Sequence, residues 1–337
     1  MAKKSEGTRM STGLVFGKFM PLHRGHLALV DFAIQHCDDL YVVLCHNKHE
    51  PIDGNTRFDW LQKKWGDNPR IHLVSFSYDE KELPNTSISS KTVSAVWAEA
   101  FKKLLPPIDI VFTSEKYGDY VAEFLGIEHR LFDEPRIQQP ISASKIRQYP
   151  LRYWDFIAPE ARSHFVKKIV LVGTESTGKS TLTEKLAQHF NTSFVPEMAR
   201  DIIEKTEECK YEDLIAIAAL HAKTITEKLP VANKLLFVDT DLRITRSFSQ
   251  FLFHRPLEVE SWIEDANRFD CYLFLQPECP FVQDGTRLPA DERLQLSKHH
   301  LNFYKDAGMN VHFINGNWQQ RFDSAVAIVN LLLNKNG

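Results

Sequence analysis

The chain has no marked imbalance of charge, no long hydrophobic run and no closely spaced pair of cysteines. With 41 Lys and Arg against 44 Asp and Glu, its formal net charge of −3 gives no overall attraction to nucleic acid or to an acidic membrane, so any anion has to be bound locally. The five cysteines form no C-x-x-C motif, and four of them lie in or beside apolar runs, which is typical of reduced, buried thiols. No apolar run approaches the ~18 residues that span a bilayer, and the N-terminal segment is polar. We therefore expect a cytoplasmic protein that binds neither membrane nor nucleic acid.

The length and the alternation of patterns predict two domains. A chain of 337 residues exceeds the size at which one hydrophobic core usually stops growing. Short β-rich runs alternate with helix-length segments, at residues 14–17, 40–45, 71–74 and 108–112 and again at residues 168–172, 235–239, 272–275 and 311–314. This order predicts an α/β fold with two tandem parallel sheets. Two prolines interrupt the polar, aromatic stretch between them, so we expect one domain at residues 12–150, a linker at 151–166 and a second domain at 167–335.

A first phosphate-binding motif follows the first expected strand and reads Gly-Lys-Phe-Met-Pro-Leu-His-Arg-Gly-His over residues 17–26. Gly17 lets the backbone approach a ligand, and Phe19 lies in the turn that leads to a helix start. At that start, His23 and His26 can donate hydrogen bonds to nucleotide phosphates and stabilise a leaving pyrophosphate. A metal site is the competing interpretation, but no Asp, Glu or Cys completes a ligand set at a suitable spacing. A purely structural helix cap is the other alternative.

A second fragment, Ile-Ser-Ala-Ser-Lys-Ile-Arg at residues 141–147, reads as another helix start. Ser142 or Ser144 is the expected cap, with Lys145 and Arg147 in the first turns. Cations are unfavourable at a helix N-terminus unless an anion is bound there, so the fragment predicts a phosphate contact. A solvated basic turn is the alternative.

A phosphate loop lies at mid-chain, where residues 173–180 read Gly-Thr-Glu-Ser-Thr-Gly-Lys-Ser between a strand pattern and a helix pattern. Lys179 can reach the β- and γ-phosphates of ATP, and Ser180 can bind Mg²⁺. Asp239 ends an apolar run that is typical of the strand whose carboxylate holds the same Mg²⁺. The predicted nucleotide contacts of this loop are Gly173, Glu175, Ser176, Thr177, Gly178, Lys179, Ser180 and Thr181.

On the acceptor side of this second site we predict catalytic roles for Glu197, Arg200 and Asp241. Glu197 and Arg200 follow a strand at the edge of the sheet where ligands bind, and Asp241 lies two residues beyond Asp239. The choice of carboxylate that accepts the hydroxyl proton stays open, and a structural ion pair between Glu197 and Arg200 is an equal alternative. Arg287, in a charged loop with a glycine, is a candidate contact to the transferring phosphate, with a plain surface turn as the alternative.

Together, the motifs at residues 17–26 and 141–147 resemble the paired motifs of the nucleotidyltransferase superfamily, whose members release pyrophosphate. The stretch Tyr-Pro-Leu-Arg-Tyr-Trp-Asp-Phe-Ile-Ala-Pro-Glu-Ala-Arg at residues 149–162, followed by the phosphate loop, resembles the NadR-type bifunctional nicotinamide mononucleotide (NMN) adenylyltransferase and ribosylnicotinamide kinase. The resemblance runs from about residue 13 to the C-terminus. It implies a Rossmann-like nucleotidyltransferase followed by a P-loop kinase. About a dozen residues precede the first expected strand, so we expect no N-terminal helix-turn-helix domain and no DNA-binding repression.

The same resemblance implies ATP and Mg²⁺ as cofactors and nicotinamide riboside, NMN and ATP as small-molecule substrates. Nicotinamide is a flat aromatic cation that aromatic side chains can stack on. Trp97, Phe281 and Trp318 lie near the segments where the family places its stacking residues, although core packing is the alternative for each. Arg57 is a candidate phosphate contact or a solvated charge. The sequence leaves the oligomeric state open, a homo-oligomer included.

We therefore expect the C-terminal domain to phosphorylate nicotinamide riboside and the N-terminal domain to join the resulting NMN to a second ATP, giving NAD and pyrophosphate. One alternative is a fusion that acts on another nucleoside or a pantetheine-like substrate, because the paired motifs specify the transfer and not the acceptor. Another alternative, from a different class, is a regulator that senses NAD or ATP without turnover.

Overall fold

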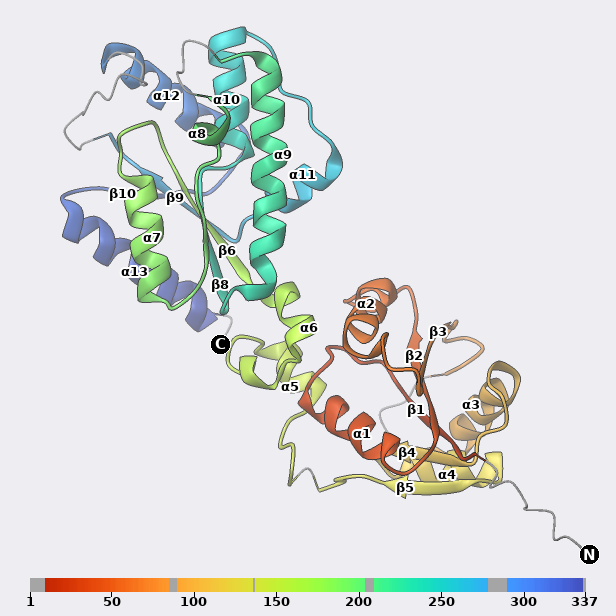
Figure 1. The fold of residues 1–337 in the computed structure, drawn as a ribbon. Helices are drawn as coiled ribbons and strands as arrows, with labels where there is room; N and C mark the ends of the chain where they lie inside the picture. Colours follow the sequence, from red (N-terminus) through yellow and green to blue (C-terminus); the bar gives the residue numbers. More distant parts are fainter. Residues whose placement is uncertain (1–9, 85–89, 136, 204–208, 278–289, 336–337) are drawn as a thin grey trace, which may run out of the picture. The chain divides into compact units, whose positions relative to one another are not determined.

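The computed structural model describes residues 10–84, 90–135, 137–203, 209–277 and 290–335, which form two compact units (Figure 1). One unit extends to Arg162 and the other begins at Ser163. Each unit has its own five-stranded sheet, and every pair of neighbouring strands in both sheets is parallel. The predicted α/β fold with two tandem parallel sheets is therefore confirmed.

The first unit places its ligand site through the order of its strands. In chain order these are β1 (Thr12–Gly17), β2 (Asp39–His46), β3 (Ile71–Ser77), β4 (Ile110–Thr113) and β5 (Glu128–Leu131), and in space they lie in the order β3-β2-β1-β4-β5. The chain thus builds outward from β1 in one direction and then returns to build in the other. Crevices for ligands form at such switch points, outside the carboxyl ends of the strands. Gly17 and Thr113 end the two strands that border this crevice.

Helices connect these strands and cover both faces of the sheet. The connecting helices are α1 (Arg24–Ile34), α2 (Gly54–Trp65), α3 (Lys91–Leu104) and α4 (Tyr117–Leu125), and β5 is followed by α5 (Ala143–Gln148), a short 3-10 turn, η1, at Trp154–Phe156, and α6 (Pro159–Arg162).

The second unit is built around β6 (Lys167–Val172), which lies at the centre of its sheet. Its other strands are β7 (Phe194–Val195), β8 (Leu235–Asp239), β9 (Cys271–Leu275) and β10 (His312–Ile314), in the spatial order β10-β9-β6-β8-β7. The helices are α7 (Lys179–His189), α8 (Ala199–Ile202), α9 (Tyr211–Lys228), α10 (Leu242–Phe253), α11 (Ser261–Ala266), α12 (Ala290–Asp306) and α13 (Trp318–Lys335), with 3-10 turns η2 (Ser163–Phe165) and η4 (Leu229–Val231).

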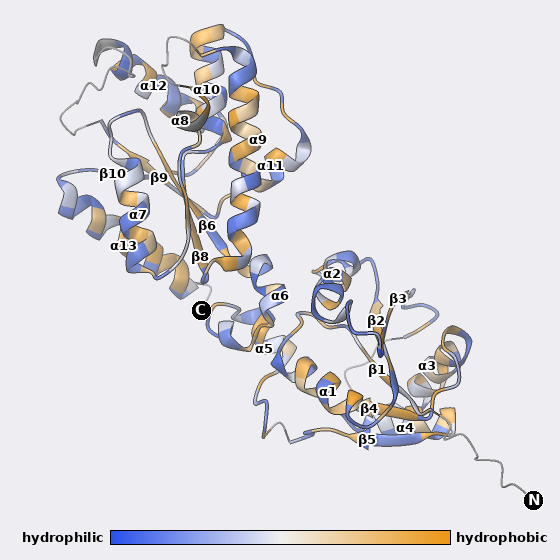
Figure 2. Ribbon diagram, viewed as in Figure 1, coloured by the Kyte–Doolittle hydropathy of each residue, from blue (hydrophilic) through white to orange (hydrophobic). Residues whose placement is uncertain are grey.

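The central strands of the second unit are hydrophobic on both faces, as Figure 2 shows for β8 and β9. Helices α7 and α13 pack against one face and share a core with β6, β8 and β9, while α9 to α12 lie on the opposite side (Figure 1). A parallel sheet covered on both faces buries nearly every side chain of its inner strands, which explains the continuous apolar runs in the sequence. Among the described residues, no helix is long and apolar enough to cross a membrane.

Candidate active sites

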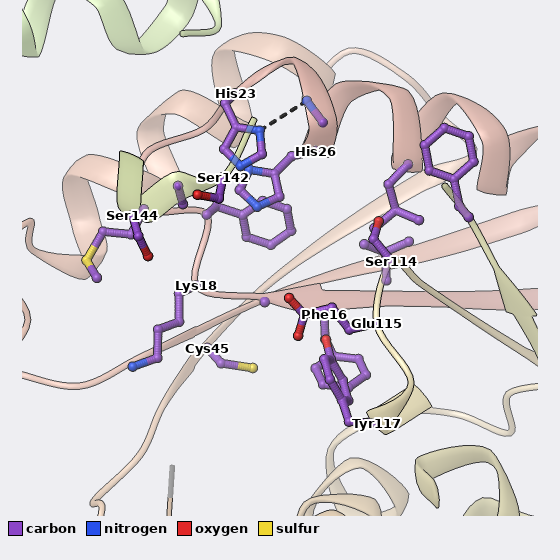
Figure 3. Close-up of a pocket in the computed structure, with 18 of the residues that line it drawn as sticks. Phe16, Lys18, His23, His26, Cys45, Ser114, Glu115, Tyr117, Ser142 and Ser144 are labelled. Atoms are coloured by element: carbon purple, nitrogen blue, oxygen red, sulfur yellow. Dashed lines mark hydrogen bonds between the residues drawn. The ribbon is translucent and has the colours of Figure 1, made fainter. Parts of the chain in front are cut away.

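A cavity of about 580 Å³ opens at the carboxyl ends of β1 and β4 in the first unit. His23, His26 and Ser142 lie together on one side of it, and Phe16, Glu115 and Tyr117 lie on the other (Figure 3). The two motifs, more than 100 residues apart in the chain, therefore line one cavity. Gly17, Phe19, Ser144, Arg147 and Trp97 also line it.

The two histidines are held in a fixed arrangement at the start of α1. His23 caps the helix, and its Nδ1 accepts a hydrogen bond from the backbone N–H of Gly25 at 3.0 Å. Since Nδ1 accepts, the proton of the neutral ring is on Nε2, which makes that atom a donor. The ring of His26 stacks on His23 with centroids 3.8 Å apart, and Phe19 packs on His26 at 4.9 Å. Capping and pocket lining are thus combined in the same side chain.

The second fragment brings a cation to the same cavity. Ser142 is the cap of α5, since its hydroxyl accepts from the N–H of Lys145 at 3.4 Å. Arg147 donates to the carbonyl oxygen of Met20 and to Ser144 Oγ, the latter at 3.3 Å. The guanidinium therefore ties α5 to the turn of the first motif. Lys145 is exposed and does not belong to the cavity lining.

Arg57 requires a correction, because the structure buries it instead of presenting it to a phosphate. Its side chain is 0 % exposed, Nη1 donates to the carbonyl oxygen of Lys18 at 2.8 Å, and Nη2 pairs with Glu50. Glu50 also pairs with Lys18 at 2.8 Å. Burial alone would raise the pKa of Glu50, but the hydrogen bonds from Lys18 and Arg57 outweigh burial and hold this pKa below its usual value. Arg57 supports the turn after β1, and Lys18 is the cation that reaches the cavity.

The segment after β4 contributes lining residues that the sequence patterns missed. Ser114 and Glu115 line the cavity, and so does the predicted Trp97, which lies before β4 in α3 and packs on Tyr78 at 5.0 Å. Thr113 holds the segment by donating to the carbonyl oxygen of Glu115 at 2.7 Å. The available signal was a polar Thr-Ser-Glu at the end of a buried run, which is where ligand-binding side chains are expected in such sheets.

In the second unit, the phosphate loop connects β6 to α7, and two of its glycines cannot be replaced without strain. Gly173 has φ 139°, and a Cβ there would lie 2.6 Å from the carbonyl oxygen of Leu275. Gly178 has φ 86°, and a Cβ there would collide with the ring of Trp318. Trp318, which is 46 % exposed, therefore lies against the phosphate loop itself.

The predicted metal ligands meet at the end of this loop. Ser180 lies close enough to Asp239 to lower its pKa, Asp239 is 0 % exposed, and Asp239 Oδ2 has no hydrogen-bond partner among the described residues. Burial raises the pKa of Asp239 to about 6, with Lys179 opposing this shift and Glu197 adding to it. A buried carboxylate oxygen without a donor, next to a hydroxyl, fits the oxygen ligands that Mg²⁺ prefers. Lys179 donates to the carbonyl oxygen of Thr174 at 3.1 Å.

The two carboxylates predicted on the acceptor side, Glu197 and Asp241, have different surroundings in the structure. Glu197 follows β7 and lies near enough to Asp239 to raise its pKa by repulsion. Asp241 is instead the cap of α10, where it accepts from the N–H of Ile244 at 3.0 Å and from the hydroxyl of Tyr304 at 2.6 Å. Both donors bond to Oδ1 of this buried carboxylate, so Asp241 has a structural role at the start of α10.

The side chains of three further predicted site residues lie outside the described part of the structure. Arg200 lies in α8, but its side chain is outside the described part of the structure. Phe281 and Arg287 lie outside the described residues altogether.

Two buried arginines that no sequence pattern indicated contact the phosphate loop. Arg293 of α12 donates to the carbonyl oxygens of Glu175 and Ser176, and Arg321 of α13 donates to that of Thr177. An arginine near the start of an expected helix reads as a solvated charge, so the patterns held no signal for either residue.

Comparison with known proteins finds a domain model that matches the second unit and relatives that match most of the chain. The model of the AAA domain family matches residues 168–321. The trifunctional NAD biosynthesis/regulator protein NadR of Salmonella typhimurium is 30% identical, over 96% of this chain and 84% of that protein. The NadR of Escherichia coli is 33% identical over 83% of this chain and 72% of that protein. The chain belongs to the NadR family.

Other relatives of this NadR family member match part of the chain or its fold. A nicotinamide-nucleotide adenylyltransferase of Thermococcus sibiricus is 21% identical over 47% of this chain and 83% of that protein. A crystal structure of NadR in complex with NR superimposes with a TM-score of 0.78 at 20% identity, and one in complex with NAD and AMP-PNP does so with 0.78 at 22% identity. Each covers 96% of both chains, so the two-unit fold is shared along the whole chain.

Proposed function

We propose that this NadR family member makes NAD in two steps, one in each unit. The C-terminal unit phosphorylates the 5′-hydroxyl of nicotinamide riboside with ATP and Mg²⁺, and the N-terminal unit transfers an adenylyl group from a second ATP to the resulting NMN. The observation that carries the proposal is that the two predicted phosphate-binding motifs lie in separate units, each at the carboxyl edge of its own sheet. Membership in the family of the NadR proteins, which are named for NAD biosynthesis, supports the same two reactions.

In the adenylyl transfer, an oxygen of the NMN phosphate attacks the α-phosphorus of ATP, and the bond to pyrophosphate breaks. The Nε2–H of His23, the ring of His26 and the N–H groups at the start of α1 stabilise negative charge at the centre of the cavity. Arg147 and Lys18, which also line this cavity, add positive charge. This step requires positioning and charge stabilisation, and no protein nucleophile takes part.

In the phosphoryl transfer, the phosphate loop and Lys179 bind the β- and γ-phosphates of ATP. Asp239 and Ser180 would hold Mg²⁺, which when bound neutralises charge on those phosphates. We assign Glu197 as the carboxylate that accepts the proton of the riboside 5′-hydroxyl. Glu197 lies close to Asp239 at the edge of the sheet, whereas Asp241 caps α10 and accepts a hydrogen bond from Tyr304.

Two substitutions test the assignment of one reaction to each unit. Lys179→Ala is expected to lower riboside phosphorylation by about 10²-fold or more and to spare NAD formation from NMN, because it removes the cation nearest the transferred phosphate. His26→Ala is expected to do the reverse. Chromatography of NMN and NAD formed from each substrate measures both activities. The proposal fails if the unmodified protein forms neither product, or if either variant, while folded, loses both activities.

A further inference from the structure

The outward-facing side of the phosphate loop in the second unit is held by arginines. A trans peptide group points its N–H and its carbonyl oxygen in opposite directions. In a loop that turns successive N–H groups toward a phosphate, the carbonyl oxygens of the same peptides must face away from it. Those carbonyl oxygens need donors when they are buried, because a buried acceptor without a partner is unfavourable.

Arg293 supplies donors to the first part of the loop. Its Nε donates to the carbonyl oxygen of Glu175 at 2.9 Å, and its Nη2 donates to that of Ser176 at 3.3 Å. The side chain is 7 % exposed, so water competes little for these bonds. The N–H groups of Ser176 and Thr177 belong to the same two peptides and therefore face the opposite way.

Arg321 supplies donors to the next part of the loop. Its Nη1 donates to the carbonyl oxygen of Thr177 at 2.9 Å, while Nη2 and Nε donate to those of Gln276 and Gly316 at 3.1 and 2.7 Å. The side chain is 0 % exposed. One guanidinium thus joins the phosphate loop, the end of β9 and the turn before α13. Trp318, at the start of the same helix, packs its ring on Gly178.

We propose that Arg293 and Arg321 are positioning residues for phosphoryl transfer, and we call them the carbonyl clasp. They bind three successive outward carbonyl oxygens so that the loop amides are turned toward the ATP phosphates before ATP arrives. Their two positive charges, delivered from α12 and α13, also add to the potential that attracts the phosphates. This inference rests on the proposed function of the second unit.

The two arginines differ in what else they hold. Arg321 joins three segments and is expected to stabilise the fold as well as the loop. The printed hydrogen bonds of Arg293 both go to carbonyl oxygens of the phosphate loop, so its replacement acts on the loop directly. Lysine keeps the charge but lacks the planar fork that bonds two carbonyl oxygens at once.

The experiment compares Arg293→Lys, Arg321→Lys and a control, Arg246→Lys, in the full-length protein. Arg246 lies in the same unit, pairs with Glu264 and touches no part of the phosphate loop among its described contacts. Titration with MgATP gives the Kd of each ATP site, with Lys179→Ala identifying the site in the second unit, and assays at saturating co-substrate give the KM for ATP and for nicotinamide riboside in riboside phosphorylation. Arg293→Ala is assayed with and without millimolar guanidinium, which restores the missing donor group.

Both clasp variants are expected to weaken MgATP binding and to raise the KM for ATP by about ten-fold, with the KM for the riboside unchanged and the control like the unmodified protein. Guanidinium is expected to restore part of the ATP affinity of Arg293→Ala. The proposal is overturned if Arg293→Lys binds MgATP as the unmodified protein does, even when its melting temperature falls. It is also overturned if adenylyl transfer in the first unit falls in parallel. If the unmodified protein phosphorylates no riboside, the proposed function fails, while MgATP binding still decides the role of the clasp.

Discussion

At the scale of single residues, Asp239 combines a proposed role as a metal ligand with a cost in stability. Its pKa of about 6 lies above the ordinary value of 3.8 because the carboxylate is buried. A carboxyl group whose pKa is raised in the folded state favours folding below pH 3.8, and this contribution is lost as the pH rises through about 6. At pH 7 the ionised, metal-free carboxylate therefore lowers the free energy of unfolding, by on the order of 1–3 kcal/mol.

Asp239→Asn is accordingly expected to raise the melting temperature of the second unit at pH 7 without Mg²⁺, since it removes a buried charge. The same change is expected to lower riboside phosphorylation by about 10²-fold or more, because a charged metal ligand is lost. Calorimetry at pH 5 and pH 7 and a kinase assay measure the two effects. At pH 5 the stabilisation should be smaller, because the native carboxyl is then largely protonated. Equal stabilisation at both pH values would contradict the argument.

A functional residue could be predicted from the sequence when it acts within a local motif, and not when it acts through contacts with distant segments. The phosphate loop acts through its backbone, and its glycines and Lys179 stand in a fixed local spacing that is visible without a structure. Arg57 and the carbonyl clasp act through burial against segments 39 to 144 residues away in the chain. No local pattern distinguishes a buried arginine from a solvated one, so Arg57 was misassigned and the clasp was missed. The capping role of Asp241 was not part of the prediction, which rested only on its position two residues beyond Asp239.

At the scale of elements, a hydrogen-bonded brace joins β4, α4 and β5 beside the first cavity. His129 Nε2 lies 2.9 Å from Thr113 Oγ1, and its Nδ1 lies 2.6 Å from Asp119. Thr113 in turn donates to the backbone of Glu115, which lines the cavity. Gly118 packs on this brace so closely that a Cβ would collide with Thr113 Oγ1 and His129 Nε2.

Gly118→Ala is therefore expected to shift the Ser114–Glu115 segment and to raise the KM of adenylyl transfer by about ten-fold, with riboside phosphorylation unchanged. Gly126→Ala, at the end of the same helix, is the matched control. Its φ of 72° makes alanine strained, but a Cβ there meets nothing within 4 Å. Gly126→Ala should lower the free energy of unfolding by about 1 kcal/mol and leave the KM of adenylyl transfer unchanged. Similar KM values in both variants would show that the brace does not position the segment.

The pattern of apolar residues in the sequence predicted those strands that are buried in the structure. The runs expected at residues 40–45 and 235–239 became β2 and β8, whose side chains are nearly all enclosed. β5 was missed because its four residues read Glu-His-Arg-Leu, and it lies at the edge of its sheet with its end residues exposed. An edge strand of this kind is specified by pairing with β4 and by the brace at His129, and neither is visible in a polar tetrapeptide.

At the scale of the whole molecule, the chain consists of two units with separate sheets and separate hydrophobic cores. The core beside β1 and β4 contains only residues up to 127, and the core around β6 contains only residues from 169 onward. The carbonyl clasp and the brace each lie entirely within one unit. The described residues assigned to each site therefore all come from one unit.

Separation of the chain between Arg162 and Ser163 is expected to leave one activity in each half. Residues 1–162 should form NAD from NMN and ATP, and residues 163–337 should form NMN from nicotinamide riboside and ATP, each within a few-fold of the intact chain, because no residue assigned to either site lies in the other half. An equimolar mixture of the halves should convert riboside to NAD after a lag during which NMN accumulates in solution. Chromatographic time courses of the halves, of their mixture and of the intact chain measure this. A folded half without activity would mean that its site needs residues from the other half, and the assignment of one complete site to each unit would be wrong.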